Sequence, residues 1–153
     1  MVGADKDVYN KILPVLRYMG KDILHCGKSG TGQLTKILNN MILFETVVAL
    51  SEAANIAEQY GMNVENLYEN ITKCSGDSFA LRNHGLKSIA KNNFPSPAFS
   101  SEYALKDLSY ALELGQKLNV KMPGALSAEN LLNTSINNGD KDLYFPVIKK
   151  YFS

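Results

Sequence analysis

The longest regular pattern of apolar side chains runs from Leu34 to Tyr60 and has the period of an α-helix. Apolar residues occupy almost every side of this helix, so it is expected to be buried on most sides. Gly61 follows in the position where helices commonly end. At 1.5 Å per residue the helix would be about 40 Å long, which predicts that it runs through the middle of the domain or into a partner subunit.

Shorter helices are expected on both sides of this long one. Helical patterns with capping or turn residues at their ends occur at residues 63–73, 79–90, 123–139 and 143–151, and in a segment that begins at Ser100 or Ser101. Ahead of the long helix, residues 5–19 predict a helix that Pro14 should kink or split, and residues 22–26 predict a short strand. The pattern indicates an all-α domain built around one long central helix and preceded by a helix–strand segment.

Composition excludes several classes of protein. The chain has 153 residues, 45% of them hydrophobic, which suits one ordinary domain with a real core. A net charge of +1 gives no reason to expect a nucleic-acid or membrane-surface partner. Glu45 and Glu52 argue against a membrane-spanning helix, and the first 25 residues lack a signal-peptide pattern, so we expect a cytoplasmic protein. Two cysteines predict reduced thiols, and no metal-ligand spacing is present.

The candidate chemistry lies at the start of the long helix. Lys36 and Asn40 are four residues apart, so their ammonium and carboxamide groups share one helix face. Apolar neighbours would partly desolvate the lysine, which lowers a lysine pKa and suits it to proton transfer. The alternative is an ordinary helix lysine whose ammonium reaches water, with Asn40 as a polar residue at a helix contact.

The segment Gly30–Asn40, Gly-x-Gly-x-x-x-Lys-x-x-Asn-Asn, resembles the catalytic-lysine segment of the β-hydroxyacid dehydrogenases, the family of 3-hydroxyisobutyrate dehydrogenase. Phe99–Leu108 resembles the family's Phe-(x6)-Lys-Asp-Leu stretch, and Ser75–Ala80 resembles its Ser-Gly-x-Ser turn. Residues 1–4 resemble the strand end that closes the family's cofactor domain. These motifs occur in the family's order along essentially the whole chain.

The resemblance also has a gap, because the Gly-x-Gly-x-x-Gly fingerprint of a Rossmann domain is missing. We therefore interpret residues 1–28 as the remnant of an N-terminal cofactor-binding domain and residues 29–153 as the all-helical C-terminal domain. The resemblance implies NAD or NADP as cofactor, bound mostly by the missing domain, and a small hydroxyacid or semialdehyde as substrate. It also implies a homo-oligomer, a dimer or tetramer.

The resemblance assigns a role to each matching residue. Lys36 corresponds to the general acid/base, and Asn40, Phe99 and Asp107 correspond to residues near the substrate. Lys106 corresponds to a residue on the cofactor side of the cleft. Each has a plainer alternative: Lys106 and Asp107 as solvated surface charges, and Phe99 as an anchor beneath the following helix.

Two functions from different classes remain open at this stage. One is the C-terminal part of an NAD(P)-dependent oxidoreductase, inactive as an isolated chain. The other is a non-catalytic helical oligomerisation module that keeps the dehydrogenase scaffold. Retention of Lys36, Asn40 and the Lys106–Asp107 pair favours the first, since a scaffold alone has no need of them.

Overall fold

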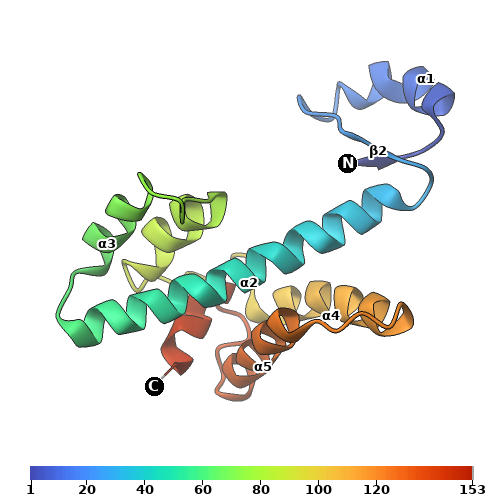
Figure 1. The fold of residues 1–153 in the computed structure, drawn as a ribbon. Coiled ribbons are helices and arrows are strands. Elements are labelled where there is room, and N and C mark those ends of the chain that lie inside the picture. The colour runs from blue at the N-terminus through green and yellow to red at the C-terminus, as the bar shows by residue number, and fades with distance from the viewer. Residues whose placement is uncertain (153) are drawn as a thin grey trace. The chain divides into compact units, whose positions relative to one another are not determined.

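The computed structural model describes residues 1–152 and divides into two compact units, Met1–Asn40 and the chain from Met41 onward. The described part is mostly helical, with one two-stranded parallel sheet near the N-terminus (Figure 1). This confirms the fold class expected from the sequence.

The first unit is a small strand–helix–strand arrangement that leads into the long helix. Strand β1 (Val2–Gly3) pairs in parallel with β2 (His25–Gly27), and helix α1 (Lys6–Leu16) connects them. The strand comes later than the expected residues 22–26. Pro14 does not split α1, because it lies within the last turn, where the helix is about to end. The Tyr9 hydroxyl donates to the Ile23 carbonyl at 2.9 Å and joins the helix to the chain before β2.

The entry into the long helix depends on glycine. Gly30 has φ +90°, a left-handed conformation that favours glycine. A Cβ atom on Gly32 would lie 2.8 Å from the backbone nitrogen of Gly3, so the first turn of the helix packs directly against the backbone of β1. Gly30 and Gly32 thus allow a tight entry into the helix and a close approach of its backbone to β1.

Helix α2 (Thr31–Tyr60) is the expected long helix, and its 30 residues correspond to about 45 Å. Gly61, at φ +86°, follows its end. Within the described residues α2 is long and apolar enough to cross a membrane, so Glu45 and Glu52 do not exclude a span by composition. Phe44, Val47 and Ala54 are nevertheless fully buried against other helices of the domain, as in a core helix of a globular protein.

The second unit packs the remaining helices around this part of α2 (Figure 1). Helix α3 (Val64–Ile71) lies beside the π-helix η1 (Leu81–Ile89), and α4 (Ser101–Lys117) lies beside α5 (Pro123–Asn137). The 3-10 helix η2 (Phe145–Tyr151) contacts η1, α4 and α5. Each expected helix is therefore present, but the segment expected at 79–90 is a π-helix and the one expected at 143–151 is a 3-10 helix. All six elements contribute to one hydrophobic core.

Two capping predictions are confirmed. The Asn63 side chain accepts a hydrogen bond from the Asn66 backbone nitrogen at 2.9 Å at the start of α3. Ser100, rather than Ser101, caps α4, because its hydroxyl accepts from the backbone nitrogen of Tyr103 at 3.2 Å. Such caps satisfy backbone donors that have no partner inside the helix.

A buried lysine joins three distant parts of this unit. Lys149 is only 5% exposed, and its ammonium donates to Glu58 Oε1 at 2.7 Å and to Asn92 Oδ1 at 2.9 Å. Asn55 donates to the Lys149 carbonyl at 3.1 Å. The C-terminal end of α2, the loop after η1 and the 3-10 helix η2 are thus held together by polar contacts as well as by the core.

Candidate functional site

Lys36 and Asn40 lie one turn apart on α2, on the same face of the helix, as the spacing requires. Lys36 is exposed and Asn40 is half-buried. Leu34 and Leu38 beside Lys36 on the helix are each 37% exposed. The Asn39 amide donates to Asn40 Oδ1 at 3.3 Å and so helps to orient the Asn40 carboxamide.

The second group of predicted site residues lies around the start of α4. Phe99 precedes the capping Ser100, and Lys106 and Asp107 lie on the second turn of the helix. Adjacent positions on a helix point in different directions: Lys106 is exposed, whereas Asp107 is only 5% exposed. The plain alternative of two solvated surface charges therefore does not hold for Asp107.

Phe99 is part of a cluster of aromatic rings. Its ring stacks on Phe44 at a centroid distance of 5.9 Å and meets the edge of Phe145 at 5.6 Å. Its carbonyl accepts a hydrogen bond from the Phe145 nitrogen at 3.0 Å. These contacts match the anchoring role that the sequence left open, and they fix the position of the partly exposed ring at the start of α4.

Tyr103 lies between the two candidate residues Phe99 and Lys106. The Lys106 ammonium nitrogen is 4.1 Å from the centroid of the Tyr103 ring, within the range of a cation–π interaction. The same ring meets Phe99 edge-on, with centroids 5.5 Å apart. The sequence analysis did not single out Tyr103, although its position three residues before Lys106 on a helix could have indicated the contact.

The Ser-Gly-x-Ser segment is a turn between α3 and η1. The Ser78 hydroxyl accepts from the Leu81 backbone nitrogen at 3.0 Å. Arg82 and Asp77 form an ion pair at 2.8 Å, and the hydrogen bond from Arg82 lowers the pKa of the Asp77 carboxyl. These contacts fit the structural interpretation of the segment.

A half-buried histidine of η1 pairs with a tyrosine that precedes η2. His84 Nδ1 hydrogen-bonds the Tyr144 hydroxyl, and the half-buried imidazole also contacts the rings of Phe79 and Phe145. Burial lowers the pKa of His84, with a smaller contribution from Lys87, and burial raises the pKa of the Tyr144 phenol. No local motif could have indicated this pair, because its members are 60 residues apart in the chain.

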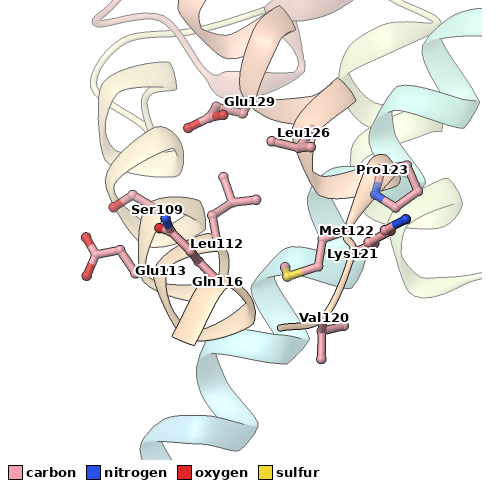
Figure 2. Close-up of a pocket in the computed structure, with 10 residues that line it drawn as sticks. All are labelled: Ser109, Leu112, Glu113, Gln116, Val120, Lys121, Met122, Pro123, Leu126 and Glu129. Atoms are coloured by element: carbon pink, nitrogen blue, oxygen red, sulfur yellow. The ribbon is translucent and has the colours of Figure 1, made fainter. Parts of the chain in front are cut away.

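A pocket of about 810 Å³ lies between α4 and α5 (Figure 2). Leu112, Met122 and Leu126 give it an apolar lining, with Glu113 and Glu129 among its polar residues. None of the residues predicted from the sequence lines this pocket. Within residues 1–152, no group of three or more His, Cys, Asp or Glu side chains could hold a metal ion, and both Cys26 and Cys74 are free thiols.

Comparison with known proteins places the candidate site residues inside a recognised domain. Residues 30–150 match the family described as the NAD-binding domain of NADP-dependent 3-hydroxyisobutyrate dehydrogenase. This match includes every residue that the sequence analysis assigned to the site. It also agrees with the prediction of NAD or NADP as the cofactor.

Individual relatives agree with the family match. The chain is 40% identical over 123 residues to 2-(hydroxymethyl)glutarate dehydrogenase of Eubacterium barkeri, covering 80% of this chain and 40% of that protein. It is 30% identical over 148 residues to a probable 3-hydroxyisobutyrate dehydrogenase of Mycobacterium bovis, covering 93% of this chain and 50% of the relative. This chain thus spans about half the length of such relatives or less.

A solved structure has the same fold. The 3-hydroxyisobutyrate dehydrogenase of Mycobacterium tuberculosis, determined with L-serine, superimposes with a TM-score of 0.88 at 30% identity. The superposition covers 99% of this chain and 53% of the mycobacterial chain. The likeness therefore includes the strand–helix–strand segment at the N-terminus as well as the helical domain.

Proposed function

Because this chain belongs to the family of the NAD-binding domain of NADP-dependent 3-hydroxyisobutyrate dehydrogenase, we propose that it is the C-terminal part of an NAD(P)-dependent oxidoreductase. The substrate is a small β-hydroxyacid or the corresponding semialdehyde. The observation that carries the proposal is the pair Lys36 and Asn40 on one face of α2, inside the region that matches the family. An ammonium and a carboxamide one turn apart can bind a single oxygen atom together.

Lys36 is the proposed general acid/base. The bound cofactor supplies or accepts the hydride at the carbon of the reacting group. In reduction the Lys36 ammonium gives its proton to the carbonyl oxygen, which completes the hydroxyl group. In oxidation the neutral Lys36 amine takes the hydroxyl proton. Asn40 donates a hydrogen bond to the same oxygen or to the carboxylate of the acid, and so fixes the substrate against Lys36.

The residues at the start of α4 have proposed roles in binding the cofactor and the substrate. Lys106 is exposed and carries a positive charge suited to the phosphates of a dinucleotide, so the residues present fit the cofactor. Phe99, fixed by its ring contacts, and Asp107 are the proposed substrate-side residues. Asp107 would contribute a carboxylate held in place by the helix.

The substrate class is tested by steady-state kinetics on the protein that carries this chain together with a cofactor domain. The panel consists of 3-hydroxyisobutyrate, tartronate semialdehyde, glyoxylate, succinic semialdehyde and 2-(hydroxymethyl)glutarate, each with NAD(H) and NADP(H). The last compound is included because of the 40% identity to the Eubacterium barkeri enzyme. Turnover of one or more members supports the proposal, and no turnover of any member with either cofactor contradicts it.

The second candidate function is a non-catalytic oligomerisation module, and exposed apolar side chains favour it. Val15 and Met19, in and after α1, are 64% and 81% exposed, and such groups commonly find a protein partner. Self-association is also compatible with the enzyme, which we propose to be a cytoplasmic homo-oligomer. Activity in the panel separates the two candidates, because a scaffold without catalytic function would turn over none of the substrates.

A further inference from the structure

Tyr103, in the second unit, contacts two of the predicted site residues at once. Its ring supports the Lys106 ammonium at 4.1 Å and meets the Phe99 ring at 5.5 Å with an interplanar angle of 61°. Phe99 in turn stacks on Phe44 of α2. The contacts form a continuous series from the buried core of the domain to an exposed cation.

These contacts affect how Lys106 binds a ligand, because a lysine side chain is flexible on its own. Four methylene groups separate the Lys106 ammonium from the backbone, and binding a phosphate requires the side chain to settle in one conformation. A cation–π contact holds the ammonium over one face of the ring while N–H donors remain directed away from the ring. Ordering of the side chain before a ligand arrives reduces the entropy lost on binding.

We propose that Tyr103 is a positioning residue that holds Lys106 ready for a phosphate of the nicotinamide cofactor. This inference rests on the proposed function, which assigns Lys106 to the cofactor. The aromatic ring provides the effect, because the Lys106 ammonium lies over the ring, 4.1 Å from its centroid. Phe99 fixes the ring from its other side through the edge contact, and Phe44 and Phe145 fix Phe99.

The expected change in cofactor affinity follows from the strength of the cation–π contact between Lys106 and Tyr103. An exposed cation–π interaction contributes about 0.5–1 kcal/mol, which corresponds to roughly a two- to fivefold change in an affinity. Loss of the ring should therefore raise the KM for the cofactor by about two- to fivefold and leave kcat nearly unchanged, since Tyr103 has no part in the proton transfer.

The first experiment uses the 153-residue chain itself and measures the geometry by NMR. The ε-methylene protons of Lys106 should be shifted upfield by the ring current of Tyr103 in the wild type and in Tyr103→Phe. In Tyr103→Leu, which keeps an apolar residue with good helix propensity, they should return to the position of an ordinary lysine. Tyr60→Leu is the control, because Tyr60 is also an exposed tyrosine on a helix but lies at the end of α2, away from Lys106 in the chain. An unchanged Lys106 shift in Tyr103→Leu would overturn the proposal.

The second experiment measures KM for NADH and NADPH in the protein that includes the cofactor domain. Tyr103→Leu should raise KM about two- to fivefold, Tyr103→Phe should restore it, and Tyr103→Leu added to Lys106→Ala should have no further effect. If Lys106→Ala leaves KM unchanged, the proposed role of Lys106 is wrong. If Lys106→Ala raises KM but Tyr103→Leu does not, the cofactor role of Lys106 survives and the positioning role of Tyr103 is contradicted.

Discussion

Gly3 and Gly32 approach each other so closely that neither tolerates a side chain. A Cβ atom on Gly32 would lie 2.8 Å from the Gly3 backbone nitrogen, and one on Gly3 would lie 2.7 Å from the Gly32 nitrogen. Both clashes are with backbone, which cannot move aside as a flexible side chain can. The first turn of α2, which leads to Lys36, can therefore pack against β1 only because neither residue has a side chain.

Gly32→Ala should loosen the first unit. The added methyl must displace either β1 or the start of α2, and overpacking of this kind costs about 1–3 kcal/mol. Hydrogen exchange should show lost protection of the Val2 and Ala4 amides, which donate to the carbonyls of Leu24 and Gly27. Gly20→Ala is the control, because its Cβ would meet only the Ile23 side chain at 3.9 Å. Equal protection in Gly32→Ala and wild type would show that the contact is not required.

Lys36→Ala should lower kcat by about 10²- to 10⁴-fold in the protein with a cofactor domain, the range expected for loss of a general acid/base. Lys36→Arg should be similarly impaired, because a guanidinium does not give up its proton near neutral pH. Affinity for NAD(H) or NADP(H), measured by fluorescence titration, should change little in either variant. Lys28→Ala, also exposed in the first unit, is the control and should retain full turnover. Near-normal kcat in Lys36→Ala would mean that Lys36 is an ordinary helix lysine.

Lys149→Met should destabilise the helical domain more than Lys150→Met does. The buried Lys149 ammonium donates to Glu58 and Asn92, and hydrogen bonds of charged groups contribute about 1.5–3 kcal/mol. Because the Glu58 side chain is 40% exposed, water can replace part of this contact, and the expected cost is about 1–2 kcal/mol. The Lys150–Asp140 pair, with Lys150 46% exposed, should contribute less than about 1 kcal/mol. Denaturant unfolding of both variants measures the free energy of unfolding that each loses. A larger loss in Lys150→Met than in Lys149→Met would contradict the prediction.

Stability should fall as the pH drops below 6.5, the ordinary pKa of histidine, because of His84. The folded pKa is lowered, chiefly by burial, so the unfolded state binds the proton more readily and acid favours unfolding. The contribution of neutral His84 is complete above 6.5 and is lost as the pH falls toward the lowered folded value. His84→Gln should show a shallower decline in the free energy of unfolding between pH 7 and 5. An identical slope in the two proteins would rule out His84 as the cause.

The isolated chain should self-associate at micromolar concentration. Val8, Ile12 and Val15 follow each other at helical spacing on α1 and are 49%, 37% and 64% exposed, which makes an apolar stripe. Light scattering should show a species larger than a monomer, and the double variant Val8→Glu, Val15→Glu should reduce its mass. A wild-type chain that remains monomeric would contradict the expectation.

The sequence by itself determined the elements and their order. Helical periodicity placed α2, α4 and α5 because an apolar face repeats every three to four residues whatever lies against it. Asn63 marked one helix start and the Ser100–Ser101 pair another, because capping depends on neighbours only three residues away. The same local logic put Lys36 and Asn40 on one face, and the family motifs supplied the chemistry that spacing left open.

Tertiary structure decided what surrounds each residue, since burial depends on segments distant in the chain. Lys106 and Asp107 are adjacent charged residues that the sequence allowed to be equally exposed. In the structure Lys106 is exposed, whereas the packing of α4 buries Asp107. Several contacts join residues from different parts of the chain. They are the ring contacts of Phe99 with Phe44 and Phe145, the hydrogen bond between His84 and Tyr144, and the ion pair of buried Lys149 with Glu58. No local pattern encodes such pairings, because each becomes a contact only when the chain closes into its core.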